Sequence, residues 1–277
     1  MKRGITVIIL LVFALLSCSH EQKEVHLSNS QMLDVLVSGT SSHIRSDVST
    51  QLMCENNIRS IYAIEKNFED SKVDTTTYSE YDSDGRLVRR TTSKCTTIGC
   101  LPFPVRQEFQ YDGNRVKRMG VYTFKNKYKY MQGYFDEKDT GKLMLFHFEN
   151  YTYKDDTIYV ESSLWRWKYI KNQEDKLIFE SSAEKLNNRK NLNDGLTYIY
   201  SDSSVVSKVK KDSLNDMEYE IYNLVNDSTV ALTYKNFPAA ENTMIEFKFG
   251  KNGLLDVLTT YEKEKAVKKE WFVYLEK

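Results

Sequence analysis

From Ile58 to the end of the chain, apolar or aromatic residues alternate with polar ones, and turn residues separate the runs. Alternation with period two is typical of β-strands that bury one face. The first strands are predicted over Ile58–Ile64, Val73–Tyr81 and Arg86–Thr92, and similar runs continue to Leu275. Long helical patterns between these runs are missing, which excludes a doubly wound α/β fold. The sequence therefore predicts a mainly β chain.

Tight turns join several of these strands. Asp84-Gly85, Asp112-Gly113 and Asn252-Gly253 stand between β-type runs, and such dipeptides favour hairpins because tight hairpin turns need positive φ. Short connections make neighbouring strands pair antiparallel. We expect an antiparallel meander of hairpins, folded as a curled sheet or a sandwich, with a barrel as the alternative.

Two short helical segments are predicted ahead of the strands. In the first, Met32, Leu33, Leu36 and Val37 have helical spacing; the weaker second one carries Val48, Leu52 and Met53. Ser28 or Ser30 can cap the first helix, and Gly39 can stop it. The chain thus divides into a signal peptide (1–17), a tether that starts at Cys18 (18–30), helical segments (31–57) and an antiparallel β domain (58–277).

The N-terminus has the pattern of an exported protein. Lys2 and Arg3 precede a run of about a dozen apolar residues, which is too short to span a bilayer permanently. The run ends in Leu15-Leu16-Ser17-Cys18, which resembles a bacterial lipobox. The resemblance implies cleavage before Cys18, acylation of Cys18 and attachment to the membrane through its acyl chains. The alternative is an ordinary secretory signal with a coincidental cysteine.

The residues after Cys18 indicate where the chain goes. Ser19 replaces the aspartate of inner-membrane lipoproteins, and Glu21 and Glu24 follow. This resembles the tether of Bacteroidota lipoproteins, which implies the outer membrane and leaves the periplasmic or cell-surface face open. The 39 Lys and Arg balance 39 Asp and Glu, and this neutral charge argues against a nucleic-acid partner.

Three other cysteines follow Cys18. Cys95 and Cys100 flank a short segment containing Gly99, and we expect them to form a disulfide in an oxidising compartment. A zinc site is the weaker alternative, because two cysteines without a nearby histidine leave the metal under-coordinated. Cys54 then remains unpaired, and a buried inert thiol is favoured there over a reactive one.

A degenerate repeat accompanies the turns. Alternating aromatic residues are followed by an acidic or small residue, then glycine, then an apolar residue; the copies are 78–88, 109–116, 134–143 and 247–255. They resemble the YD repeats of RHS-type proteins, which implies successive hairpins in one antiparallel sheet. Only this architecture is carried over, because the copies are too few and too irregular for a toxin-enclosing shell. Turn chemistry without common descent explains the pattern equally well.

One strand offers a candidate binding face. Alternation places Trp165, Trp167 and Tyr169 on one side of a strand, and Arg166 and Lys168 on the other. The aromatic side could stack sugar rings, but cross-strand packing is the favoured explanation.

Candidates for chemistry are weak. His147 has no obvious partner nearby in sequence, and Asp82-Ser83-Asp84-Gly85 suits a hairpin turn better than a calcium loop. Carboxylates such as Asp155 and Asp156 are plentiful, but their spacing identifies no hydrolase. No nucleophile elbow, phosphate loop or zinc-protease motif occurs. We therefore expect neither catalytic residues nor a metal or other cofactor.

The sequence thus predicts a lipid-anchored, non-enzymatic envelope protein that binds a glycan or protein partner. One alternative is a structural or immunity-type protein that sequesters another protein. A less favoured alternative is a hydrolase whose carboxylates converge only in the fold.

Overall fold

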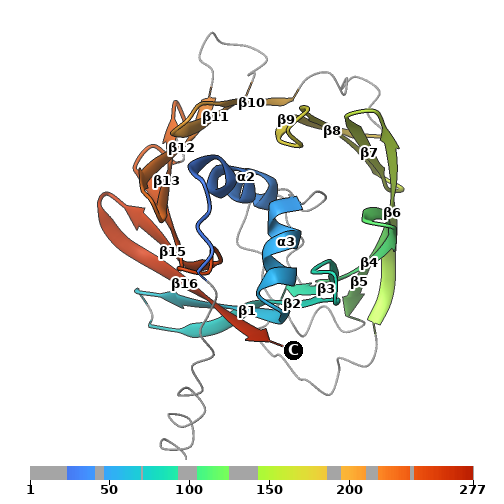
Figure 1. Ribbon diagram of the computed structural model, residues 1–277, viewed down its shortest axis with the longest axis horizontal. Helices are drawn as coiled ribbons and strands as arrows, with labels where there is room; N and C mark the ends of the chain where they lie inside the picture. The colour runs from blue at the N-terminus through green and yellow to red at the C-terminus, as the bar shows by residue number, and fades with distance from the viewer. Residues whose placement is uncertain are drawn as a thin grey trace, which may run out of the picture.

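The computed structural model describes residues 24–40, 47–69, 71–92, 105–124, 143–185, 195–209, 218–237 and 240–276. Within these ranges two helices precede sixteen strands, which form a closed antiparallel barrel (Figure 1). The elements are α2 (Asn29–Thr40), α3 (Asp47–Glu55), β1 (Ile58–Asn67), β2 (Val73–Tyr81), β3 (Leu87–Thr92), β4 (Val105–Asp112), β5 (Arg115–Phe124), β6 (Leu143–Lys154), β7 (Thr157–Glu161), β8 (Trp165–Lys171), β9 (Leu177–Glu184), β10 (Leu196–Tyr200), β11 (Ser204–Val209), β12 (Glu218–Asn226), β13 (Thr229–Lys235), β14 (Thr243–Phe249), β15 (Leu255–Glu262) and β16 (Lys265–Glu276).

Closure of the barrel corrects the expected fold. The curled sheet or sandwich is wrong, because β1 pairs with β16 from Ser60 opposite Leu275 to Asn67 opposite Lys268. Each other strand pairs with its neighbour in sequence. Pairing of the first and last strands satisfies the backbone groups that two open edges would expose. Local alternation is the same in an open and a closed meander, so the sequence pattern could not distinguish them.

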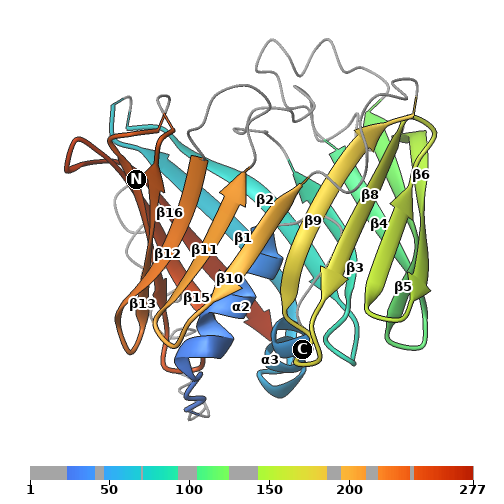
Figure 2. The same ribbon diagram turned by 90° about the horizontal axis from the view of Figure 1, so that it is seen from above.

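The two ends of the barrel differ. Short turns join β2 to β3, β4 to β5, and so on to β14 and β15, all at one end, which we call the turn end. The opposite end, which we call the loop end, has several longer connections (Figure 2). Most of the repeat copy 134–143 lies outside the described residues.

Helices α2 and α3, which together we call the plug, lie inside the ring of strands at the turn end (Figures 1 and 2). The Ser28 hydroxyl accepts a hydrogen bond from the Gln31 amide, and the Ser28 amide donates to Oε1 of Gln31. This reciprocal pair is a capping box, and it confirms Ser28 as the cap of α2. The predicted apolar face of α2 is buried in the main core together with residues of the barrel wall.

Two glycine turns fit against α3. Gly85 and Gly253 have φ of 76° and 75°, where side chains other than glycine are strained. A Cβ on Gly85 would clash with the Thr50 carbonyl of α3, and one on Gly253 would lie 3.1 Å from Leu52. Both glycines therefore satisfy the turn and also leave room for the plug.

A tyrosine contact recurs at the turn end, and one of its tyrosines lies in a repeat copy. Tyr111 near the end of β4 donates a hydrogen bond from its hydroxyl to the carbonyl of Leu87, the first residue of β3, at 2.9 Å. Equivalent bonds run from Tyr153 to Val116, Tyr200 to Leu177 and Tyr274 to Leu255. Tyrosines thus tie neighbouring strands together around this end. A descent shared with YD repeats remains a prediction.

Candidate functional site

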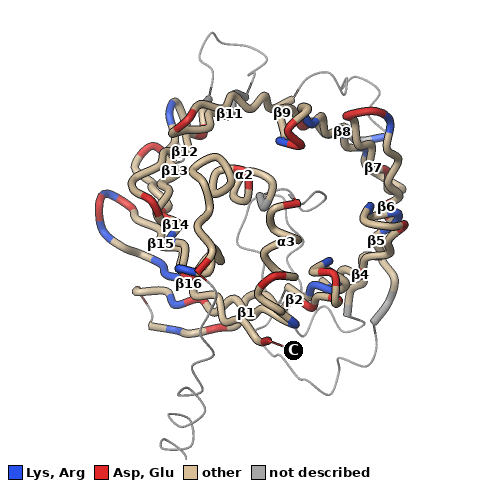
Figure 3. Tube along the Cα trace, in the orientation of Figure 1, with Lys and Arg blue, Asp and Glu red and all other residues tan. Residues whose placement is uncertain are grey.

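Cross-strand register separates the inner wall of the barrel from the outer wall. Paired residues in a sheet share a face, and residues that pack against α2, such as Val160, Tyr169 and Phe247, mark the inner face. The positions between them point outward. The outward ionisable residues include Lys66, Glu80, Arg89, Glu108, Arg118, Glu161, Arg166, Lys168, Glu246, Lys248 and Lys269. Charges are spread around the whole ring (Figure 3).

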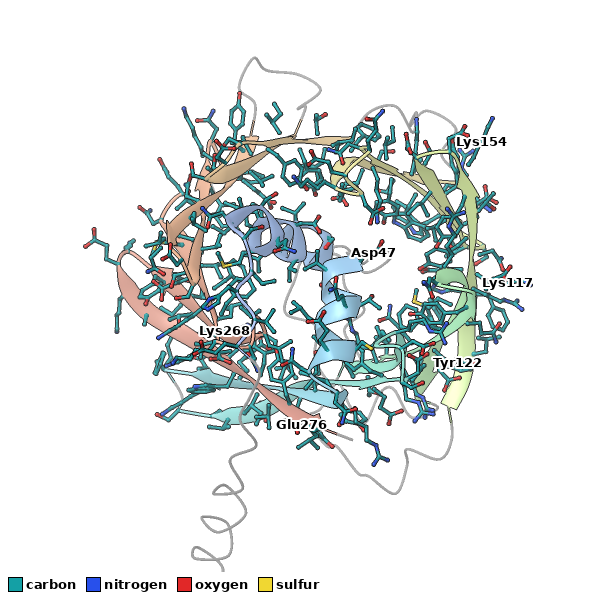
Figure 4. The ribbon with its side chains drawn as sticks, in the orientation of Figure 1. Asp47, Lys117, Tyr122, Lys154, Lys268 and Glu276 are labelled. Atoms are coloured by element: carbon teal, nitrogen blue, oxygen red, sulfur yellow. The ribbon has the colours of Figure 1, made fainter. Side chains whose placement is uncertain are left out.

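Ion pairs connect some of these outer charges. Nη1 of Arg89 lies 2.8 Å from Oε2 of Glu80, and Nη2 of Arg106 lies 2.7 Å from Oε1 of Glu108. Glu80 is the penultimate residue of β2, close to the turn that leads to β3, and Arg106 and Glu108 lie on β4. Figure 4 shows Lys117 and Lys154 outside the ring and Asp47 inside it. The outer wall therefore presents charged side chains of both signs on several neighbouring strands.

The predicted aromatic face lies on the inner wall of β8. Tyr169 is 3% exposed, Trp167 is half-buried, and Trp165 is 38% exposed. Exposure thus rises along the strand from the plug toward the loop end. The rings of Trp165 and Trp167 are stacked with centroids 6.5 Å apart and planes 28° apart. The strand presents an accessible indole surface where the plug no longer covers it.

Polar groups stand on the strands beside this surface. On β6, Nε2 of His147 lies 3.0 Å from Oε1 of Glu149, whose side chain is almost fully buried. On the other side, the Tyr198 hydroxyl donates to Oε1 of Glu180 at 3.0 Å. Glu180 is directly opposite Tyr169 in the sheet. Both carboxylates therefore already accept a hydrogen bond or face an imidazole.

The tyrosines among these groups act as neutral donors. Burial is the largest cause that raises the pKa of Tyr151 well above 10, and the charge of Glu149 raises it further. Burial likewise raises the pKa of Tyr198, and Glu180 adds to this. No described residue accepts a hydrogen bond from the buried Tyr151 hydroxyl. Leaving such a group unpaired costs about 1–3 kcal/mol.

A cavity of about 380 Å³ opens at the turn end between α3 and the turns. It contains a carboxyl pair, because Asp47 at the start of α3 hydrogen-bonds Asp175 in the β8–β9 turn. Nζ of Lys171 lies 2.7 Å from Oδ2 of Asp175. Loss of hydration is the largest cause that raises the pKa of Asp47; Asp175 adds to it and Lys171 opposes it. This arrangement lies where the plug meets the turns of the barrel wall.

The remaining predicted sites are placed as follows. Cys18, Cys95 and Cys100 lie outside the described residues. Cys54 is exposed on α3, so the expectation of a buried thiol there is wrong. In the predicted partial calcium loop, Asp82 accepts backbone hydrogen bonds from Asp84 and Arg86, as in a plain turn.

Two findings concern the described residues as a whole. No three His, Cys, Asp or Glu side chains gather there in a way that could hold a metal ion. Neither helix in these ranges is long and apolar enough to cross a membrane.

Sequence reasoning missed the partner of His147. Glu149 is two residues away, and strand alternation puts the two side chains on one face, so the signal was present. It also missed the inward position of the plug and the Asp47–Asp175 pair, which no local pattern indicates.

No family model and no curated protein matches this chain. Among solved structures, a porin-like protein from Bacteroides uniformis is 10% identical, with a TM-score of 0.46, over 79% of this chain and 98% of its own. A porin-like protein from Bacteroides vulgatus is 11% identical, with a TM-score of 0.30, over 77% and 97% of the two chains. Likenesses this low decide nothing about function.

Proposed function

We propose that this protein is a lipid-anchored envelope protein whose barrel stands in water beside the membrane and binds a ligand on its inner wall. One observation carries the proposal: ionisable side chains recur on the outer wall among exposed apolar ones such as Leu145 and Ile199, and the inner wall exposes aromatic surface beyond the plug. A barrel embedded in lipid presents an apolar band about 25 Å tall on its outside. Here Arg89 and Glu108 face each other directly on the outside of β3 and β4.

The energetics favour water outside the barrel. A Lys or Arg on the lipid face at the bilayer midplane costs about 2–4 kcal/mol, and outward basic residues recur on β1, β3, β8 and β16. Acyl chains on Cys18 would then supply the membrane attachment. The plug occupies one end of the barrel, which suits a receptacle better than a channel.

The anchor is tested with radiolabelled palmitate. The full chain is expected to incorporate the label, and the Cys18→Ala chain is expected not to. Equal labelling of both chains would reject Cys18 as the anchor.

The water-exposed wall is tested by cysteine labelling in opened membranes. In a background with Cys54, Cys95 and Cys100 all replaced by alanine, Ile199→Cys and Leu145→Cys place thiols on exposed outer-wall positions, and Asp112→Cys serves as a turn control. A membrane-impermeant maleimide is expected to modify all three within about an order of magnitude in rate, because each faces water. Protection of the two wall positions, with the turn position reactive, would show that the wall lies in lipid.

A further inference from the structure

The inner wall of β6 to β8 carries a second feature beside the aromatic surface. The register pairs Tyr151 with Val160 and Val160 with Trp167. Val160 is fully buried, so the two larger side chains flank it in one row. The next row toward the loop end contains Glu149 on β6 and Trp165 on β8, because Asn150 and Arg166 both align with Glu161. Two rows therefore each combine one indole with one polar group.

These rows combine exposed apolar surface with one buried hydroxyl that lacks an acceptor among the described residues. Trp165 offers an exposed indole, whereas the buried hydroxyl of Tyr151 has no acceptor among the described residues. Ligand sites commonly combine apolar or aromatic walls with a few fixed polar groups of this kind. A ligand that fits must bring an apolar face for the indoles and oxygen atoms for the polar groups.

The charges beside the indoles favour a neutral ligand. Glu149 already faces His147 at 3.0 Å, and Glu180 already accepts from Tyr198 at 3.0 Å. A cationic ligand would have to displace these partners. A sugar ring has an apolar C–H face, and its hydroxyl groups both donate and accept hydrogen bonds without carrying charge. The apolar face of a sugar ring matches the indoles in the two rows, and its hydroxyl groups match the polar side chains beside them.

We propose that Trp165 and Trp167, with Glu149 and Tyr151, form a binding site for a neutral oligosaccharide on the inner wall. This inference rests on the proposed function, because the inner wall must be open to a water-borne ligand. Trp165 supplies the outer stacking surface, and Trp167 continues it toward the plug. Tyr151 donates its hydroxyl to a sugar oxygen.

The test is a fluorescence titration of the purified full-length chain in a sugar-free detergent. The probes are maltohexaose, cellohexaose and hexa-N-acetylchitohexaose, with deacetylated chitohexaose as a cationic match for the last. The chain has three tryptophans. Trp271 is the control, since it pairs with Val257 on the outer wall. We expect at least one neutral probe to change the emission spectrum with saturation.

The variants then assign the site. Trp165→Ala is expected to weaken binding about tenfold or more, because indole stacking contributes energy of that order. Tyr151→Phe is expected to weaken it less and to leave the fold intact, and Trp271→Ala is expected to leave affinity unchanged. Circular dichroism verifies that each variant is folded.

Three results would overturn the inference. These are saturation by no neutral probe, unchanged affinity in both Trp165→Ala and Tyr151→Phe, and tighter binding of the cationic probe that Glu149→Gln abolishes. The maleimide experiment is independent of any sugar. A water-exposed wall without sugar binding would therefore reject this inference alone, and a lipid-protected wall would reject the proposed function.

Discussion

At the turn end of the barrel, short turns close around a plug that the chain itself supplies, whereas at the loop end the strands are joined by several longer connections. Buried apolar residues of α2 fill the first region, such as Leu33, which has no exposed surface. Trp165 in the second region remains 38% exposed on the inner wall. The comparison teaches that the chain packs a core at one end and leaves aromatic surface exposed toward the other.

The largest expected effect comes from emptying the plug. Leu33→Ala should lower the free energy of unfolding by about 3 kcal/mol, because it removes a fully buried side chain and leaves a cavity. Leu145→Ala on the outer wall is the matched control and should change it by less than about 0.5 kcal/mol, since Leu145 is 46% exposed. Urea unfolding followed by circular dichroism measures both. Equal losses in the free energy of unfolding would mean that Leu33 in the plug contributes no more to stability than Leu145 on the surface.

The next effect concerns the glycines of the turn end. Gly85→Ala should destabilise the chain by about 2–3 kcal/mol, because it adds positive-φ strain and a clash with α3. Gly113 has φ of 57°, yet a Cβ there would meet nothing within 4 Å. Gly113→Ala should therefore cost only about 1 kcal/mol of strain. Thermal unfolding of the two variants separates the clash from the strain, and indistinguishable midpoints would contradict the docking of α3 on Gly85.

Much of the turn end could be predicted from sequence. Gly85, Gly113 and Gly253 indicated hairpin turns, and all three have positive φ. Ser28 is one of the two serines predicted as possible caps, and the apolar spacing of α2 predicted its buried face correctly. These features depend on residues close together in the chain, so local patterns contain them.

Closure and the polar neighbours of the indoles could not be predicted in the same way. Pairing of Ile61 with Tyr274 joins residues from opposite ends of the chain, and an open meander has the same alternation. The strand pattern placed Trp165 and Trp167 on one face. Alternation alone does not predict whether that face lines the inside of a barrel. The row that relates Tyr151 to Trp167 depends on the registers of two successive strand pairs.

A smaller effect is expected from the tyrosines that tie the strands at the turn end. Tyr111→Phe removes the hydroxyl that donates to the Leu87 carbonyl, and should lower the free energy of unfolding by about 1 kcal/mol. Tyr159→Phe is the control, because Tyr159 faces outward on β7. Chemical denaturation of both variants provides the measurement. A loss from Tyr159→Phe as large as that from Tyr111→Phe would remove the structural role assigned to these tyrosines.

The smallest effect concerns the pH dependence of the plug. The pKa of Asp47 is raised above its ordinary value of 3.8, chiefly by loss of hydration and then by Asp175. A carboxyl group with a raised pKa in the folded state stabilises that state below its ordinary pKa, and this contribution is lost as pH rises through the raised value. The Asp47→Asn chain cannot titrate there, and its amide can still donate to Asp175. Its stability relative to the parent chain should therefore increase as pH rises from below 3.8 through the raised pKa. Asp175→Asn removes the charge beside Asp47, so the pKa of Asp47 should lie closer to 3.8. The stability difference should then change over a narrower pH range. Unfolding midpoints measured across this pH range test the pair, and a stability difference that does not vary with pH would contradict the raised pKa of Asp47.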